Sequence, residues 1–249
     1  MANQQFYTKG KYLKNNPSLH SEDVLFKFGK IKPFLDVFAK EIRKKKVKIM
    51  DVGGGSGLII KEVQKYLKKR HGIKVEKVLL ELSPEILAIQ KKKNKDAKAI
   101  HGSVTKIPLK SKVDLTLMID VLEHVPNPNK ALKELRRVSK FVLFKVPLED
   151  CLAFNTVNWF TRGRFRQRLI KILGHINVYS KKSLEQDLKK YCGEVWDEGL
   201  VNAYKYSFLK ERRLDLKIFY LDAWVVSWFS ESLAQKIYGD FLMVLVKTK

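Results

Sequence analysis

The chain is short of cysteine, of acidic residues and of long apolar runs. Its 249 residues include two cysteines, Cys151 and Cys192, too few for a disulfide framework or a cysteine-rich metal site. No uninterrupted apolar run reaches the roughly 18 residues that a membrane-spanning helix needs, and the N-terminus has no apolar signal core. These absences predict a cytoplasmic protein.

Histidines are also few and scattered. They stand at positions 20, 71, 101, 124 and 175. None pairs with another at the i, i+4 spacing, or with a nearby cysteine, as the ligands of a zinc site often do. The spacing therefore predicts no metal centre.

The shortage of acids leaves a large positive charge. Fifty Lys and Arg stand against 26 Asp and Glu, for a net charge of +24. Such a surplus favours polyanionic partners, either RNA, DNA or an anionic membrane face. The alternative is a lysine-rich solvated surface, and the clusters at 43–48, 65–70 and 91–95 fall at helix ends or in loops, as that interpretation expects.

Strand-like and helix-like segments alternate along the chain. This order predicts an α/β fold with a doubly wound parallel sheet. The expected strands are 47–52, 75–81, 97–101, 113–120, 141–147, 195–208 and 241–247. The expected helices are 21–45, 58–70, one starting at Ser83-Pro84, 126–138, 183–191 and an added stretch near 216–237.

A glycine turn follows the first expected strand. In VKIMDVGGGSGLII, residues 47–60, Asp51 is followed by Gly53, Gly55 and Gly57. Strand, glycine turn and helix together indicate a nucleotide-binding edge. Leu58 stands where a dinucleotide fingerprint needs its third glycine, and the Gly-Lys-Ser/Thr of a phosphate-binding loop is absent.

The turn resembles the first motif of the class I S-adenosylmethionine-dependent methyltransferases. The resemblance implies a Rossmann-like, mostly parallel seven-stranded sheet with an antiparallel last strand and a helical C-terminal insertion. It also implies that Asp51 lies near the methionine amino group of the cofactor and that the glycines make room for it. Glu81, which ends the second expected strand, would bind the ribose hydroxyls, as acids at this place do in dinucleotide folds.

Two further segments extend the resemblance. Family members often carry Gly-Asp where this chain has Gly102-Ser103, so Ser103 and the backbone of Val104 are the predicted adenine contacts. DVLEHV, residues 120–125, resembles the segment whose backbone meets the methionyl part of the cofactor. His124 is then either a general base or a structural histidine that fixes the loop before Pro126.

The N-terminal segment resembles a lid found in some small methyltransferases. It contains Tyr12 and NPSLHSED, residues 16–23, before a helix that carries Lys27. In the lid interpretation His20 is a second candidate base. Alternatively, Ser21 or Asp23 simply caps the helix.

The C-terminal half contains the features that bear on the identity of the methyl acceptor. GHINVYS, residues 174–180, resembles a segment of quinone-pathway and related small-molecule methyltransferases. Tyr220, Trp224 and Trp228 recur every four residues and give the added helix an apolar face. That face either lines a substrate pocket or rests on a membrane, or it packs in the core or in a homodimer interface. Arginines interleaved with aromatics between Trp159 and Arg168 are a weak signal for phosphate or base binding.

We therefore predict an S-adenosylmethionine-dependent methyltransferase that acts on a small organic acceptor by in-line displacement. The alternatives are an RNA methyltransferase that uses the basic surface, and a non-catalytic cofactor-binding regulator. The expected organisation is an N-terminal lid and helix (1–46), a cofactor-binding core (47–150) and a completion of the sheet with substrate-cap insertions (151–249), all in a single domain. The predicted catalytic residues are His124 and His20. The predicted cofactor contacts are Tyr12, Asp51, Gly53, Gly55, Gly57, Glu81, Leu82, Ser103, Val104 and Asp120.

Overall fold

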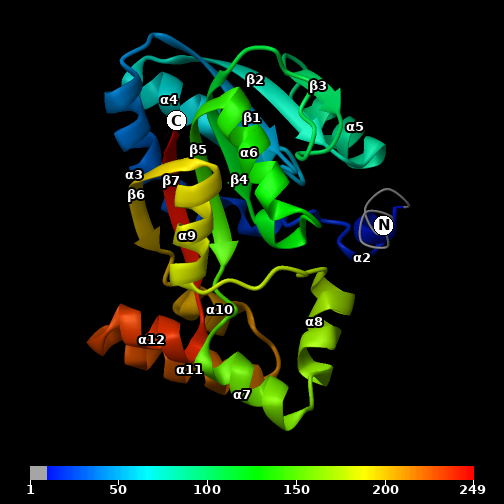
Figure 1. Cartoon of the computed structure of the whole chain (residues 1–249), viewed down its shortest axis with the longest axis vertical. Coiled ribbons are helices and arrows are strands. Elements are labelled where there is room, and N and C mark those ends of the chain that lie inside the picture. The colour runs from blue at the N-terminus through cyan, green and yellow to red at the C-terminus, as the bar shows by residue number, and fades with distance from the viewer. Residues whose placement is uncertain (1–9) are drawn as a thin grey trace.

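Seven strands form one mixed sheet through the middle of the molecule (Figure 1). The computed structural model describes residues 10–249. The strand order is β3-β2-β1-β4-β5-β7-β6. The strands are β1 (Lys46–Val52), β2 (Lys74–Glu81), β3 (Lys98–His101), β4 (Val113–Ile119), β5 (Ser139–Pro147), β6 (Gly193–Leu200) and β7 (Phe241–Thr248).

The last strand alone runs opposite to the other six. β1 pairs in parallel with β2 and β4, and β4 pairs in parallel with β5. β7 is antiparallel to both β5 and β6. The predicted fold class is thereby confirmed. The order of connection reverses between β1 and β4, so the carboxyl ends of these strands form the crevice where such sheets bind ligands.

Helices cover both faces of the sheet and create two apolar cores. On one face α6 (Pro128–Val138) and α9 (Lys181–Tyr191) pack against alternate strand residues. On the other face α3 (Val24–Ile42) and α4 (Leu58–His71) do the same. Because the central strands are buried on both faces, they are almost continuously apolar. The remaining segments of this half are α2 (Lys11–Asn15), η1 (Ser21–Asp23), α5 (Pro84–Lys93) and η2 (Leu122–His124).

The C-terminal half holds more helix than we expected. Two helices occupy the stretch after Pro147 where no element is predicted, namely α7 (Leu152–Phe160) and α8 (Arg164–Leu173). Three more precede β7, namely α10 (Tyr204–Lys210), α11 (Leu214–Phe229) and α12 (Glu231–Tyr238). These helices form the lower part of the molecule in Figure 1.

The prediction of a strand through Phe208 was therefore wrong after Leu200. The alternation of Tyr204, Tyr206 and Phe208 imitates a strand, but packing decides the conformation. Tyr204 is buried, and its hydroxyl donates a hydrogen bond to the Gly239 carbonyl. The single helix expected near 216–237 is divided at Ser230, whose hydroxyl accepts a hydrogen bond from the Leu233 backbone N–H and caps α12. Within residues 10–249, no helix has the length and apolar character needed to cross a bilayer.

Candidate active site

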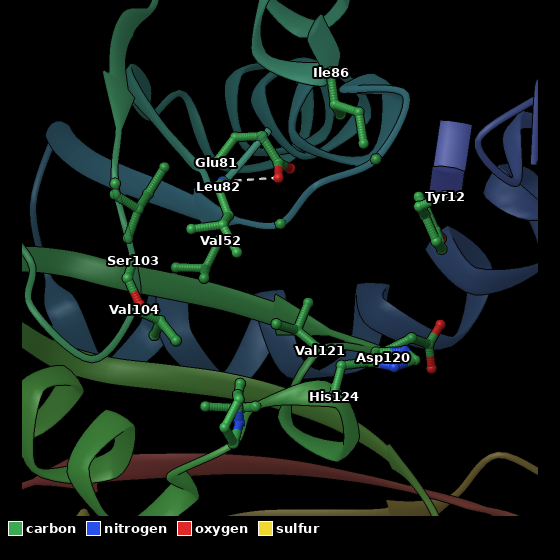
Figure 2. A pocket seen from close by; sticks show the side chains of 16 residues that line it. Tyr12, Val52, Glu81, Leu82, Ile86, Ser103, Val104, Asp120, Val121 and His124 are labelled. Atoms are coloured by element: carbon green, nitrogen blue, oxygen red, sulfur yellow. Dashed lines mark hydrogen bonds between the residues drawn. The ribbon is translucent and has the colours of Figure 1, made fainter. Parts of the chain in front are cut away.

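A cavity opens at the carboxyl ends of β1, β2 and β4, and Figure 2 shows the side chains around it. Its wall contains most of the predicted site residues. These are Tyr12, Gly53, Gly55, Glu81, Leu82, Ser103, Val104, Asp120 and His124. The apolar part of the same wall was not predicted from the sequence; it includes Val52, Leu80, Ile86, Val121 and Val125. Asp51, Gly57 and His20 are not in the wall.

The glycine turn places bare backbone at the cavity. Gly53 and Gly55 have φ angles of 61° and 52°, in the left-handed region that side chains disfavour. A Cβ on Gly53 would also lie 3.0 Å from Val121 Cγ2. Gly57 has different neighbours. A Cβ added to it would lie 3.0 Å from Asn94 Nδ2 and 3.1 Å from Gln90 Cα. Gly57 therefore allows α5 to approach the turn, and it does not face the cavity.

Asp51 lies behind the turn, almost fully buried at 2% exposure. A side chain on Gly54 would collide with its carboxylate. Within residues 10–249 its Oδ2 atom has no hydrogen-bond partner. Burial, followed by the charge of Glu81, raises the pKa of Asp51 to about 7. An unpartnered buried carboxylate of this kind suits a cationic group bound nearby, because it cannot obtain its hydrogen bonds from water.

Glu81 is held rigidly at the end of β2. Its Oε1 accepts hydrogen bonds from the backbone N–H groups of Leu82, at 2.8 Å, and Ser83, at 3.1 Å. Its Oε2 accepts one from Gln90 Nε2 at 3.1 Å. Gln90 also donates to the Gly55 carbonyl at 3.2 Å, so one side chain joins Glu81 to the glycine turn. Burial raises the pKa of Glu81, and these hydrogen bonds counter part of that effect.

Asp120 is fixed between two ammonium groups. Lys27 Nζ lies 2.9 Å from its Oδ2, and Lys145 binds its Oδ1. Burial alone would raise the pKa of Asp120, but Lys145 and Lys27 hold it well below its usual range. The residue has a φ of 56°, which turns the chain sharply from β4 into η2. The ionised carboxylate therefore lies beside Tyr12 and His124 at the cavity in Figure 2.

His124 lies at the floor of the cavity and is bonded to a loop from the C-terminal half. Its Nδ1 lies 3.0 Å from the Gly174 carbonyl. Since a carbonyl only accepts, Nδ1 carries the proton and Nε2 the lone pair. Burial, then the neighbouring His175, lowers the pKa of His124 to about 4. His124 is consequently neutral at physiological pH, with its hydrogen bond to Gly174 fixing the tautomer.

A second histidine lies beside the first. The rings of His124 and His175 are 4.8 Å apart, edge to face. His175 Nδ1 lies 2.6 Å from Glu149 Oε1, and Arg166 binds the other oxygen of Glu149 at 3.2 Å.

Glu123, also close to the two histidines, is buried, and its pKa is raised well above the usual value, chiefly by burial. The ligand atoms of Glu123, His124 and His175 lie within 4.8 Å of one another. Spacing along the sequence could not find this cluster, because the fold brings His175 to the other two. Burial favours protonated Glu123, which is a poor metal ligand, so we assign no metal to it.

The backbone of residues 16–23, the segment predicted to form a lid, lies against the glycine turn. A Cβ on Gly55 would lie 3.2 Å from the Leu19 carbonyl oxygen. His20 is outside the cavity wall, its side chain is 46% exposed, and its Nδ1 lies 3.9 Å from Asp23. Asp23 makes no capping hydrogen bond to α3. It binds Tyr206 and Lys210 of α10 instead, both at 2.6 Å.

The apolar face of α11 is divided between packing and exposure. Trp224 packs beside the buried cluster of Tyr204, Ala223 and Ala234, whereas Trp228 is 67% exposed. The wall of the cavity contains no residue after Pro126. The interpretation of this face as a lining of the cavity thus finds no support in the structure.

Comparison with known families identifies the class of protein. Residues 25–192 match the family described as the methyltransferase domain. The chain belongs to this methyltransferase family. The predictions of a class I methyltransferase and of S-adenosylmethionine as cofactor are confirmed. No curated protein matches the methyltransferase.

Solved structures agree on the fold. The methyltransferase resembles the plantazolicin methyltransferase BamL, solved in complex with a triazolic desmethylPZN analog and SAH, at 16% identity and a TM-score of 0.61, covering 100% of this chain and 96% of that one. A cyclopropane synthase from Mycobacterium tuberculosis has 12% identity and a TM-score of 0.56, with 86% and 82% covered. Geranyl diphosphate C-methyltransferase from Streptomyces coelicolor has 9% identity and a TM-score of 0.54, with 82% and 74% covered. At these identities the likeness concerns the fold alone.

Proposed function

We propose that the methyltransferase transfers a methyl group to a small organic acceptor bound beside His124. The observation that carries the proposal is the convergence of Glu81, the glycine turn and His124 on one cavity at the switch point of the sheet. The wall is mostly apolar, with a few polar groups in fixed positions, as small-molecule sites are.

The residues present fit S-adenosylmethionine. Glu81 would accept hydrogen bonds from the ribose hydroxyls, and the Gly53–Gly55 backbone would face the ribose and methionyl parts. Ser103 and Val104 would contact adenine. The unpartnered Asp51 oxygen and the ionised Asp120 would favour the methionine amino group. When bound, the cofactor supplies an electrophilic methyl group on a sulfonium.

The protein's main contribution is then position. Aligning an acceptor in line with the bond to be broken can remove roughly 7 to 11 kcal/mol from the barrier in favourable cases. An acceptor that must lose a proton also needs a base within hydrogen-bond reach. We assign that role to His124, whose tautomer leaves Nε2 as the accepting atom. His20 is the weaker candidate because it lies outside the wall of the cavity.

The experiment follows a labelled methyl group. The enzyme is incubated with S-adenosylmethionine carrying a tritiated methyl group and with an extract of the source cells, and the products are sorted into small-molecule, lipid, RNA and protein fractions. We expect label in the small-molecule fraction. Label in RNA would support the RNA methyltransferase instead, and cofactor binding without any transfer would support the regulator. The Glu81→Ala variant serves as the control for enzyme-dependent label.

The organisation of the chain belongs to the same proposal. We retain residues 1–46 as the lid and its helix, of which residues 1–9 lie outside the part that the structure describes. Residues 47–150 are the cofactor-binding core, and 151–249 are the completion of the sheet with its cap. The contact of Leu19 with the Gly55 region supports the lid. A cytoplasmic location and a homodimer are further parts of the proposal, and gel filtration with light scattering tests the latter.

A further inference from the structure

Helices α7 and α8 form a hairpin with an unusual amount of exposed apolar surface. Neither helix has a buried residue. Trp159 and Phe160, at the tip of the hairpin, are 74% and 72% exposed, and Ile172 is 53% exposed. Large side chains at such exposure are uncommon when they occur together, and they mark surfaces that bind something. We call residues 152–173 the hairpin.

The same segment carries only positive charge. From Leu152 to Leu173 it contains five basic residues and no acidic one. Arg166 is half-buried and bonded to Glu149. Across residues 10–249 no ion pair involves the remaining four, which are the exposed Arg162, Arg164, Arg168 and Lys171. Aromatic and aliphatic side chains among unpaired cations are typical of helices that lie in a membrane interface.

The hairpin is nevertheless a defined structure. The Phe154 and Phe165 rings pack edge to face across it at 5.4 Å. Asn158 Oδ1 accepts a hydrogen bond from the Arg166 backbone N–H at 3.1 Å, and Thr161 Oγ1 accepts one from that of Phe165 at 3.1 Å. Its apolar side chains are therefore held outward by the fold. The hairpin is followed by Gly174, whose carbonyl binds His124 in the cavity wall. The turn between α7 and α8 lies at the lower end of the molecule in Figure 1.

We propose that the hairpin docks the enzyme on an anionic lipid bilayer, with Trp159 and Phe160 at the level of the headgroups and the four unpaired cations against lipid phosphates. Charge complementarity argues for this occupant. A second copy would bring two patches of the same sign together in a symmetric contact, at an electrostatic cost. RNA would engage the arginines and could stack on the aromatics, but it offers nothing to the exposed aliphatic residues Leu152, Val157, Ile172 and Leu173.

The test is sedimentation with vesicles of two compositions. Wild-type enzyme is mixed with vesicles of phosphatidylcholine alone or of equal parts phosphatidylcholine and phosphatidylglycerol. We expect binding to the anionic vesicles, little binding to the neutral ones, and weaker binding as salt rises. The double variant Arg164→Gln/Arg168→Gln is expected to bind about thirtyfold more weakly, since each cation near an anionic surface contributes about fivefold. The double variant Trp159→Ser/Phe160→Ser is expected to bind the anionic vesicles at least about tenfold more weakly than the wild type does.

Matched controls separate the hairpin from general charge and hydrophobicity. Lys68→Gln/Lys69→Gln removes two exposed cations from α4, and Leu25→Ser/Leu209→Ser removes two exposed apolar side chains elsewhere. Both controls should bind vesicles as the wild type does. Circular dichroism of every variant verifies folding.

Four results would overturn the proposal. The first is equal binding of the wild type to both kinds of vesicle, and the second is a loss of binding in the controls as large as in the hairpin variants. Another is a concentration-dependent dimer that Trp159→Ser/Phe160→Ser dissociates, which would identify a second copy as the occupant. The last is salt-sensitive binding of RNA that Arg164→Gln/Arg168→Gln abolishes while vesicles are not bound. None of these measurements requires the acceptor or methyl transfer, so their failure is distinct from failure of the proposed function.

Discussion

The cofactor end of the sheet and the hairpin use charged residues in opposite ways. At the sheet, Asp120 is bonded to two lysines, and three donors hold Glu81. In the hairpin four cations have no acid to pair with among residues 10–249, and the tryptophan and phenylalanine of its tip lie in solvent. The first arrangement fixes groups for a ligand of known chemistry. The second leaves charge and apolar surface available to a large partner, so substitutions should separate the two regions cleanly.

His124→Ala is expected to have the largest effect of the substitutions, a loss of turnover at the cofactor end of the sheet that leaves the hairpin unaffected. A general base contributes about 10²- to 10⁴-fold to turnover, and we expect a loss of that order with cofactor affinity unchanged. Steady-state kinetics with the identified acceptor and calorimetry with S-adenosylmethionine measure both. His71→Ala, which removes a histidine bound to Asp36 on α3, is the control. Loss of cofactor affinity in His124→Ala would show that the residue is structural.

Asp120→Ala should destabilise the fold. It leaves Lys145, 2% exposed, and Lys27 without their shared carboxylate. Breaking a buried ion pair by removing one partner costs about 3 to 5 kcal/mol, which urea denaturation would detect as a lower free energy of unfolding. Glu76→Gln, at the exposed pair with Lys46, should change it little. Equal changes in the free energy of unfolding of the two variants would contradict the assignment of Asp120 to a buried ion pair.

Asp51 should make stability depend on pH. Its pKa is raised to about 7, so between about pH 4 and 7 the folded protein holds a proton that the unfolded chain releases. The contribution of Asp51 to the free energy of unfolding is therefore fully present below about pH 4, and it is lost as the pH rises from there through about 7. The loss is up to about 4 kcal/mol, for a shift of roughly three pKa units. Unfolding free energies at pH 5 and pH 8 should differ less in Asp51→Asn than in the wild type, and an unchanged difference would contradict the assignment.

Glu81→Ala should weaken S-adenosylmethionine binding by at least about tenfold, because the two ribose hydroxyls lose a charged acceptor. Glu81→Gln keeps one acceptor oxygen, so its affinity for S-adenosylmethionine should lie between that of Glu81→Ala and that of the wild type. Calorimetry with the purified protein measures both. Unchanged affinity in Glu81→Ala would remove the ribose assignment.

The smallest effect on stability is expected in the hairpin. Trp159→Ser removes a side chain that is mostly in solvent, so the free energy of unfolding should change by no more than about 0.5 kcal/mol. Phe38→Ala, in the core under β5, is the contrasting variant and should cost about 3 to 5 kcal/mol. A large loss in Trp159→Ser would mean that the hairpin is part of the core.

The sequence predicted those features that depend on neighbouring residues. The strand, glycine turn and helix at 46–71 and the acid at the end of β2 are contiguous patterns, and they identified both fold and cofactor. Gln90 and Lys145 could not be found in this way, because each reaches the site from another element, and Lys27 was noted only as a residue of the helix that follows NPSLHSED. Helices α7 and α8 were missed for a different reason. In α8, Phe165, Leu169 and Leu173 do recur at helical spacing, but the segment was interpreted through its arginines and aromatics instead.

The contacts of Asp23 have a consequence for the proposed lid and for the exchange of cofactor and product. Its carboxylate binds Tyr206 and Lys210, and the ring of Phe26 stacks on that of Tyr206 at 3.9 Å. The segment that crosses Gly55 is thus tied to α10, far along the chain. Withdrawal of that segment has to break these contacts or carry α10 with it. With residues 16–23 as the proposed lid, the rate at which spent cofactor leaves would then be set at the contact between η1 and α10, whose residues are not part of the cavity wall.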